Sequence, residues 1–275
     1  MTGAAEWQGP VGAIWASEYA RTDRSFRHLS AKLDAAIAAV APERGTALDI
    51  GCGAGSTSFA LAVAKPGLHI TGLDVAPELI AAANARAADY PNTRFAVADL
   101  NQGVPAAAPL DLLFSRHGVM FFDDPAETFA ALRAAANPGA PLIFSCFRSV
   151  SLNPWAAELA TAVTGQAPQP PATYEPGPFA FADPAFVTSL LTGAGWRDIT
   201  SEAVDYDYIA GEGADPVGDA LQFFRRIGPA ARALKLASDA ERPALLDKLR
   251  RILEDHRNND RVSFRAAAWI WHAAA

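Results

Sequence analysis

A glycine-rich turn follows an apolar run early in the chain, and its residue types point to ligand binding. The run 47–50 (ALDI) leads into the loop 51–55 (GCGAG) and then into a segment that favours helix. Glycine lets the backbone turn sharply at the carboxyl end of a strand and lets a ligand approach where a Cβ would block it. We therefore predict a buried strand, a loop that holds a nucleotide-like ligand, and the first turn of a helix.

The spacing of the glycines bears on the kind of ligand. In the dinucleotide-binding fingerprint the sixth position of the loop is glycine or alanine, whereas counting from Gly51 places Ser56 there. The loop instead follows the pattern Asp-x-Gly-x-Gly-x-Gly, which begins at Asp49 and ends at Gly55. A glycine loop is a weak signal by itself, so the ends of the later strands have to decide.

Acidic residues end the next two apolar runs. Asp74 closes the run 68–74, about 20 residues beyond the loop, where an acid can accept the ribose hydroxyls of a nucleoside. Asp99 follows the run 94–98, and its carboxylate is placed to accept from an adenine amino group while Leu100 packs on the ring. Parallel strands end at one edge of their sheet, so these residues should converge on one crevice.

The glycine pattern and the two acids resemble those of the class I S-adenosylmethionine-dependent methyltransferases, over residues 45–147. Two more specific runs, 115–122 (SRHGVMFF) and 153–155 (NPW), resemble a bacterial subgroup related to the ubiquinone and menaquinone methyltransferases. The resemblance implies S-adenosyl-L-methionine as the cofactor, Asp74 as the ribose acid and Asp99 as the adenine acid. We predict that the cofactor contacts are Asp49, Gly51, Cys52, Gly53, Gly55, Asp74, Val75, Ala98, Asp99, Leu100 and Ser115.

The amino-terminal segment 6–28 is unusually rich in aromatic and arginine side chains. In methyltransferases that look like this chain, amino-terminal helices form part of a lid that excludes water. Trp7 and Trp15 are therefore predicted to contact the substrate, although simple packing of a helix on the core explains them equally well. Phe147 and Arg148, which follow the fifth predicted strand, complete the predicted substrate contacts.

His117 is the predicted general base. It follows the fourth predicted strand, 110–115, whose carboxyl end should face the reacting methyl group, and imidazole titrates near neutral pH. A sulfonium methyl group is already activated, so few catalytic residues are needed, and a role for His117 in the pocket wall or in cofactor contact stays open. The five histidines are scattered and no metal-ligand spacing occurs, so no metal is expected.

Apolar strands alternate with helical patterns from residue 48 to 147, which predicts a right-handed, doubly wound α/β sheet. We expect a Rossmann-like sheet of seven strands, mostly parallel, with helical cap insertions. The family resemblance places the last strand, 262–272, antiparallel between the fifth and sixth. The predicted division is a helical lid (1–44), a cofactor-binding core (45–147), an insertion (148–183), continued core (184–210), a helical cap (211–260) and a final core strand (261–275).

Composition limits the partners. The net charge of −7, from 23 basic and 30 acidic residues, and the lack of a long basic cluster make nucleic acid an unexpected substrate. Cys52 and Cys146 are expected to be small buried residues. No apolar run approaches the roughly 18 residues of a spanning helix and no signal sequence is evident, so we expect a cytoplasmic protein that does not bind membranes. A homodimer stays open.

These features together predict a methyltransferase that acts on a small, bulky and apolar molecule. Two alternatives stay open: an NAD(P)-dependent oxidoreductase, which Ser56 disfavours, and a protein that binds S-adenosylmethionine without catalysis. The residues do not identify the acceptor or its reacting atom.

Overall fold

The computed structural model describes residues 4–104, 109–169, 171 and 173–275. Its centre is one sheet with the strand order β3-β2-β1-β4-β5-β8-β6, in which β7 pairs with β8 beside this path. The strands are β1 Gly45–Ile50, β2 Leu68–Asp74, β3 Thr93–Val97, β4 Leu112–Arg116, β5 Pro141–Phe147, β6 Arg197–Glu212, β7 Arg257–Asn258 and β8 Arg261–Ala274. The predicted sheet is confirmed, and the two-residue β7 adds an eighth strand.

Strands β1 to β5 run parallel, and β8 is antiparallel to both β5 and β6. β4 and β5 are buried along nearly their whole length. Such strands read as continuous apolar runs because helices cover both faces of a parallel sheet. The predicted place of the last strand, between β5 and β6, is confirmed.

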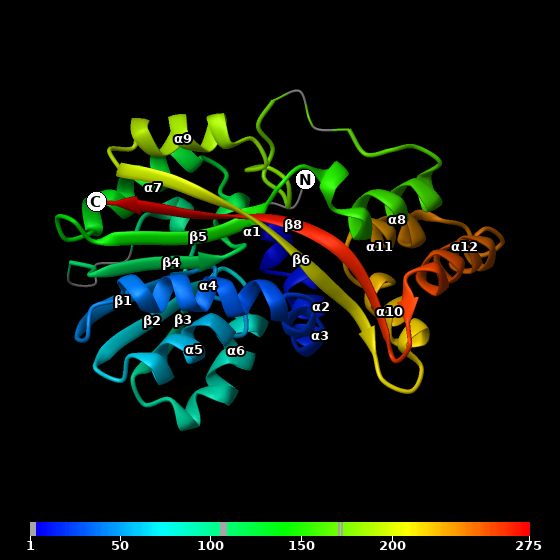
Figure 1. The fold of residues 1–275 in the computed structure, drawn as a ribbon, viewed down its shortest axis with the longest axis horizontal. Helices are drawn as coiled ribbons and strands as arrows, with labels where there is room; N and C mark the ends of the chain where they lie inside the picture. Colours follow the sequence, from blue (N-terminus) through cyan, green and yellow to red (C-terminus); the bar gives the residue numbers. More distant parts are fainter. Residues whose placement is uncertain (1–3, 105–108, 170, 172) are drawn as a thin grey trace.

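Helices cover the two faces of the sheet. In Figure 1, α4, α5 and α6 lie on one side and α7 and α9 on the other. Their bounds are α4 Arg27–Val40, α5 Ser56–Ala64, α6 Pro77–Arg86, α7 Pro125–Ala135 and α9 Pro184–Gly193. Four of the five follow a signal in the sequence: proline occupies the first turn of α6, α7 and α9, and Gly55 at φ +84° precedes α5.

Two groups of helices stand apart from these layers, beyond the carboxyl ends of β1 and β4 (Figure 1). We call the first group the lid: α1 Ala4–Trp7, α2 Pro10–Ser17 and α3 Tyr19–Ser25. We call the second group the cap: α8 Pro154–Thr164, α10 Pro216–Phe224, α11 Pro229–Leu236 and α12 Arg242–Asp255. The remaining helical elements are four short 3-10 helices: η1 Ala87–Asp89, η2 Leu100–Gln102, η3 Val119–Phe121 and η4 Val150–Leu152.

The long strands β6 and β8 connect the sheet to the cap. The segment predicted as continued core ended at residue 210, but β6 continues to Glu212 after a register shift between Ile209 and Gly211. A Cβ at Gly211 would lie 1.9 Å from the carbonyl oxygen of Pro216, so only glycine lets α10 begin against the strand. Gly211 therefore marks a close approach of two elements and not the end of the strand.

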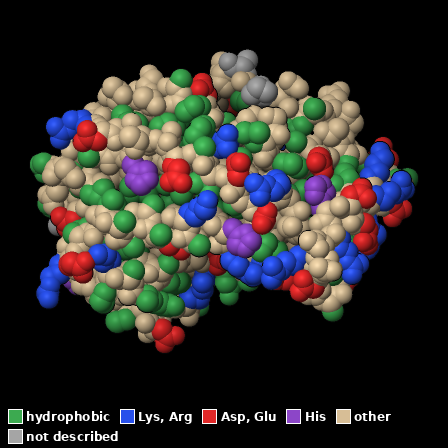
Figure 2. Space-filling model, in the orientation of Figure 1, with side chains coloured by type: hydrophobic (Ala, Val, Ile, Leu, Met, Phe, Trp, Pro, Cys, Tyr) green, Lys and Arg blue, Asp and Glu red, His purple; other side chains and the backbone are tan. Residues whose placement is uncertain are grey.

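On the face shown in Figure 2, basic and acidic side chains are interspersed over the surface. Cys52 and Cys146 are both buried and unpaired, as predicted. In the part of the chain that the structure describes, no helix has the length and apolar character needed to cross a bilayer.

Candidate functional site

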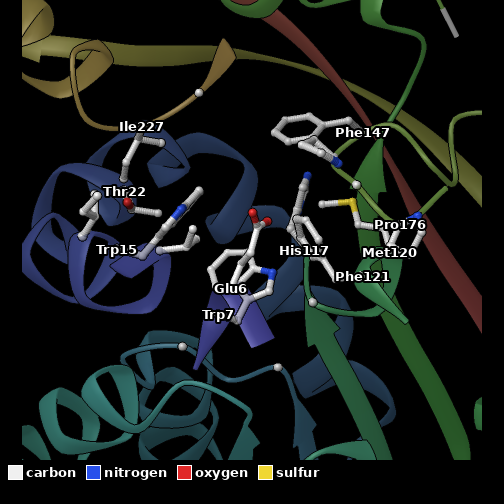
Figure 3. Close-up of a pocket in the computed structure, with 18 of the residues that line it drawn as sticks. Glu6, Trp7, Trp15, Thr22, His117, Met120, Phe121, Phe147, Pro176 and Ile227 are labelled. Atoms are coloured by element: carbon white, nitrogen blue, oxygen red, sulfur yellow. The ribbon is translucent and has the colours of Figure 1, made fainter. Parts of the chain in front are cut away.

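A cavity of about 1370 Å³ opens at the carboxyl ends of β1, β2 and β4, and the lid and the cap supply the rest of its wall. Figure 3 shows His117 and Phe147 on one side of it and Trp15, Thr22 and Ile227 on the other. The glycine loop, the two predicted nucleoside acids and the aromatic residues of the lid all line this one space. The predicted convergence of the strand ends therefore occurs.

The glycine loop is shaped by its contact with the turn after β4. Gly51 has φ +63°, and a Cβ on it would lie 2.9 Å from Cα of Gly118. Ser115 holds the two turns together, because its hydroxyl donates to the Ile50 carbonyl (2.6 Å) and accepts from the Gly118 amide (3.1 Å). Ser115 is fully buried and lies behind the cavity wall, as does Gly55. Both residues shape the predicted cofactor site without lining it.

Asp74 and Asp99 both line the cavity, and each also organises its own loop. The Asp74 carboxylate accepts from the amides of Gly53 and Ala76, both at 2.9 Å. Burial raises the pKa of Asp74, against the effect of these amides. Asp99 accepts from the amide (3.0 Å) and the side chain (2.9 Å) of Asn101, and from the side chain of Gln102 (3.3 Å). Each carboxylate keeps lone pairs for a ligand, since an ionised carboxylate has about four acceptor positions.

Asp49 is a buried acid in the wall of the cavity. It accepts a hydrogen bond of 2.6 Å from the Ser58 hydroxyl. Burial raises the pKa of Asp49 to about 7, although the Ser58 bond and the Arg116 charge oppose the shift. A cationic ligand group beside Asp49 would favour its ionised form and would itself be stabilised by it. The remaining predicted cofactor contacts also line the cavity: Cys52, Gly53, Val75, Ala98 and Leu100.

His117 is held rigidly between aromatic rings. Its centroid lies 4.2 Å from that of Phe147 and 4.8 Å from that of Phe26. Its Nδ1 is 2.8 Å from the Ser145 hydroxyl, and its backbone has φ +61°, an uncommon conformation for a residue other than glycine. Burial, followed by the Arg116 charge, lowers the pKa of His117 to about 3. The imidazole is therefore neutral near pH 7.

The second ring nitrogen of His117 is free to meet a ligand. Nε2 is buried and has no hydrogen-bond partner within the described residues, and the side chain lines the cavity. Buried polar atoms in native proteins are nearly always paired, so a lone one in a cavity wall indicates a place where a ligand binds. The ring can donate or accept there, depending on its tautomer.

The four predicted substrate residues divide into two groups. Trp7, Trp15 and Phe147 line the cavity, and Trp7 also packs on Trp15 with ring centroids 5.6 Å apart. Arg148 does not line it. Its guanidinium pairs with Asp205 (2.9 Å) and lies 4.9 Å from the centroid of the Trp269 ring.

One lid residue that the sequence did not single out lies at the centre of the polar contacts. Asp23 of α3 accepts from the Ser56 hydroxyl (2.5 Å) and from Arg116 (2.7 Å), and it lies 3.6 Å from Arg86. Ser56 begins α5, so a carboxylate of the lid occupies the positive end of the helix that follows the glycine loop. No local pattern marks Asp23, because its partners come from three other elements.

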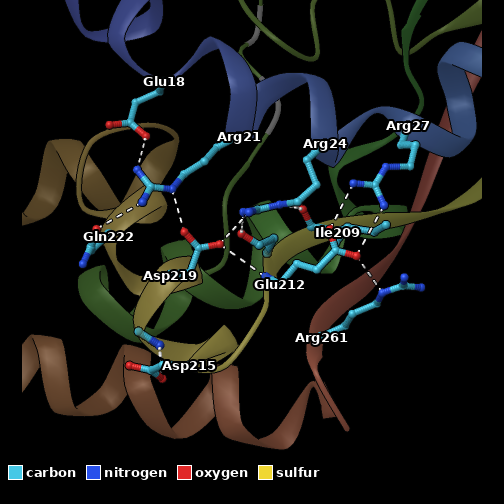
Figure 4. A network of polar contacts seen from close by, with 12 residues as sticks. Glu18, Arg21, Arg24, Arg27, Ile209, Glu212, Asp215, Asp219, Gln222 and Arg261 are labelled. Atoms are coloured by element: carbon cyan, nitrogen blue, oxygen red, sulfur yellow. Dashed lines mark hydrogen bonds and ion pairs between the residues drawn. The ribbon is translucent and has the colours of Figure 1, made fainter.

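A network of ion pairs joins the lid to the cap (Figure 4). Asp219 of α10 binds Arg21 (2.7 Å) and Arg24 (2.5 Å), both on α3. Glu212, at the end of β6, binds Arg27 (3.0 Å) and Arg261 (2.9 Å), and the hydrogen bond from Arg27 is the largest of the effects that lower its pKa. The arginine-rich segment of the sequence is therefore the seam along which the lid meets the cap.

Comparisons with known proteins concern the domain and the fold. The model of a family described as a methyltransferase domain matches residues 48–142. Trans-aconitate 2-methyltransferase of Methylobacterium radiotolerans is 31% identical over 124 residues, which make up 45% of this chain and 45% of that protein. The chain spans less than half the length of the curated relatives it matches.

Two solved structures share the fold over most of this chain. YcgJ of Bacillus subtilis has a TM-score of 0.57 at 14% identity and covers 89% of this chain and 97% of its own. Phosphoethanolamine N-methyltransferase 2 of Haemonchus contortus, in complex with phosphomonomethylethanolamine and S-adenosylhomocysteine, has a TM-score of 0.55 at 17% identity. It covers 97% of this chain and 58% of its own. The family match shows a methyltransferase domain over residues 48–142, and the strand order and these likenesses show a fold shared with solved methyltransferases.

Proposed function

We propose that this protein transfers a methyl group from S-adenosylmethionine to a small, bulky and apolar molecule. The observation that carries the proposal is the acidic crevice at the ends of β1, β2 and β3, where Asp49, Asp74 and Asp99 face one cavity. S-adenosylmethionine carries a sulfonium and an ammonium group, so such a crevice complements its charge. The family match and the S-adenosylhomocysteine bound in the Haemonchus structure support the same cofactor.

The same charges argue against a dinucleotide. NAD binds with its pyrophosphate at the amino end of the helix after the glycine loop. In this protein Ser56 at that position already donates to the carboxylate of Asp23. A pyrophosphate would have to displace Asp23 and would lie close to Asp49. The local electrostatics therefore favour a cationic cofactor over an anionic one.

The chain's own residues would bind, orient and shield the reactants. Asp74 would bind the ribose hydroxyls and Asp99 with Leu100 the adenine, a proposal supported by the position of all three in the cavity wall. S-adenosylmethionine supplies a methyl group already activated on a sulfonium. His117 would hold the acceptor through its neutral ring. Trp7 and Trp15 of the lid would exclude water, which strengthens the electrostatic interactions inside the site.

The cap side of the cavity supports a bulky apolar acceptor. The rings of Phe26, Phe147, Trp155 and Tyr208 line it beside His117. Trp155 and Tyr208 stack with centroids 4.8 Å apart and planes 5° from parallel. Aromatic walls of this kind bind ligands mainly by removing their apolar surface from water. The small-molecule name of the trans-aconitate relative agrees with an acceptor of limited size.

Calorimetric titration with S-adenosylhomocysteine, with NAD as the control ligand, tests the proposal. We expect micromolar binding of S-adenosylhomocysteine and none of NAD. Asp74→Ala should weaken that binding by more than about tenfold, because an acid that hydrogen-bonds a ligand is worth roughly 1.5–3 kcal/mol. Asp89→Ala is the matched control, since Asp89 is exposed on η1 outside the cavity.

Binding of NAD instead of S-adenosylhomocysteine would overturn the proposed cofactor. Equal effects of Asp74→Ala and Asp89→Ala would remove Asp74 from the ribose site. If S-adenosylhomocysteine binds but no acceptor in a broad panel is methylated, the chain is better described as a binding protein without catalysis.

A further inference from the structure

The cavity extends well beyond the crevice that the cofactor would occupy. Its far wall is formed by the cap, through the turn between α10 and α11, one side of α11 and the start of α12. This wall differs in character from the crevice, because its charged side chains are basic. They are Arg225, Arg226, Arg232, Lys235 and Arg242. The gathering is notable in a chain whose net charge is −7.

Two of these five side chains are held by other residues. Arg226 binds Glu18 of the lid (2.9 Å), and Arg242 binds Asp239 (2.6 Å) and the Ala237 carbonyl (3.0 Å). These two arginines therefore fix the edge of the wall to neighbouring residues.

The other three basic side chains are exposed to solvent and unpaired. Within the described residues, Arg225, Arg232 and Lys235 have no ion pair and no side-chain hydrogen bond. We call these three the basic rim. The acidic residue Glu175 also lines the cavity, but its neighbour Tyr174 ties that segment to the Phe122 carbonyl (2.7 Å), next to η3. The basic rim thus has positive charge to offer a ligand.

Aromatic residues connect the basic rim to His117. Trp155 of α8 lies against the turn before α11, since a Cβ on Gly228 would be 3.9 Å from its ring. Trp155 in turn packs on Phe147, with centroids 5.1 Å apart, and Phe147 packs on His117 at 4.2 Å. A continuous apolar surface therefore runs from the imidazole to the basic side chains.

Each part of this wall selects a different part of a ligand. The aromatic rings favour an apolar, flat group, whose burial is worth roughly 25 cal/mol per Å². Guanidinium and ammonium groups bind carboxylates and phosphates through charged hydrogen bonds.

We propose that the acceptor is an amphiphile: an apolar, ring-like body with a carboxylate or phosphate at the end remote from the methylated atom. The basic rim binds the anionic end, the rings of Trp155 and Phe147 cover the body, and the reacting atom lies beside His117. This inference rests on the proposed function, because it concerns the acceptor of the same site.

A pair of fluorescent probes tests the proposal. 1-Anilinonaphthalene-8-sulfonate and N-phenyl-1-naphthylamine share one aromatic body, and only the first carries an anion. Both are titrated into the protein with saturating S-adenosylhomocysteine, so that the crevice is filled. We expect the sulfonate to bind at least about tenfold more tightly than the neutral probe, since charged hydrogen bonds are worth roughly 1.5–3 kcal/mol each.

Variants locate the binding. The triple substitution Arg225→Gln, Arg232→Gln and Lys235→Gln should weaken the sulfonate at least about tenfold and leave the neutral probe within about twofold. The matched control is Lys32→Gln, Arg250→Gln and Arg251→Gln, which removes three exposed charges outside the cavity and should change neither probe. Thermal melting of both triple variants checks that they fold.

The proposal is overturned if the two triple variants weaken the sulfonate equally, or if the basic-rim variant weakens both probes alike. If the basic-rim variant does not fold, the salt dependence of probe binding to the wild-type protein tests the proposal. Raising NaCl to 1 M should weaken the sulfonate and spare the neutral probe, and equal loss of both contradicts the proposal. The affinity for S-adenosylhomocysteine, measured first on the same samples, reports separately on the proposed function.

Discussion

The two ends of the cavity differ in charge and in how the chain builds them. The crevice end carries Asp49, Asp74 and Asp99, each at or next to the carboxyl end of one of three strands in the family-matched segment. The cap end carries the basic rim on a helix and a turn that follow more than a hundred residues later. The comparison shows one cavity with an acidic end suited to a cationic cofactor and a basic end suited to an anionic acceptor.

His117 lies where the two ends meet, and replacing it should produce the largest effect. We expect His117→Ala to lower turnover of a working acceptor on the order of 100-fold, because the acceptor loses its polar contact in the cavity wall. Production of S-adenosylhomocysteine measures this loss. Binding of S-adenosylhomocysteine should change little, and His69→Ala, at an exposed position on β2, is the control.

The pH profile distinguishes orientation from base catalysis at His117. With its pKa lowered to about 3, the ring is neutral throughout the range from pH 6 to 8, so kcat should not rise through its titration there. A rise with a midpoint near 6.5 that disappears in His117→Ala would instead restore the general base predicted from the sequence. Unchanged turnover in His117→Ala would remove His117 from catalysis.

The seam between lid and cap should give the next largest effect. Asp219→Asn weakens two ion pairs to the lid, and its side chain and that of Arg24 are largely buried. We expect a loss of about 1–2 kcal/mol in the free energy of unfolding, measured in urea. Asp239→Asn, which removes one exposed pair, should cost no more than about 0.5 kcal/mol.

Hydrogen exchange sharpens this test. In Asp219→Asn the amides of residues 18–27 should exchange faster, while those of β4 and β5 stay protected. Faster exchange throughout the protein would mean that the seam supports the whole fold and not the lid in particular.

Replacing Asp49 should change stability by an amount that depends on pH. Its pKa is about 7 in the folded protein and about 3.9 in an unfolded chain, so folding favours the protonated acid. This contribution to stability is complete below about pH 4 and is lost as pH rises through about 7. Asp49→Asn mimics the protonated form, so at pH 8 it should raise Tm by about 5–10 °C relative to its effect at pH 5, because the two pH units between 5 and 7 are worth roughly 2.7 kcal/mol.

Binding of the cofactor should reverse the preference of Asp49 for its protonated form. The affinity of the wild-type protein for S-adenosylmethionine should rise between pH 6 and pH 8, as the carboxylate becomes available to a cation. Asp49→Asn should flatten this rise, and the exposed Asp89→Asn should not. If Asp49→Asn leaves the pH dependence intact, Asp49 does not face the charged groups of the cofactor.

Much of the crevice was predictable because its signals are local. Glycines at positive φ, an acid at the end of a strand and a proline in the first turn of a helix each reflect the conformation of a few neighbouring residues. The position of a residue in the sequence did not show whether its side chain lines the cavity or supports the wall from behind. Gly55 and Ser115 belong to the predicted set but stand behind the wall, since only packing decides which way a side chain points.

The cap end was less predictable because it is assembled from distant segments. Leu234 and Trp155 show apolar patterning in the sequence, but nothing local places Arg232 on a cavity or Arg148 away from one. The predicted core segment stopped at residue 210, short of the end of β6 at Glu212, because no local pattern shows that α10 packs against the strand at Gly211.

The amino-acid sequence by itself determined the class of fold, the glycine loop and the acids that follow it, because backbone preferences and the alternation of strand and helix act over short stretches. The tertiary structure alone decided the rest of the site. It placed Asp23 at the start of α5, buried His117 so that its ring stays neutral, and brought Arg225, Arg232 and Lys235 to the edge of the cavity. Charge and burial at those positions depend on neighbours that are remote in sequence, and only folding brings them together.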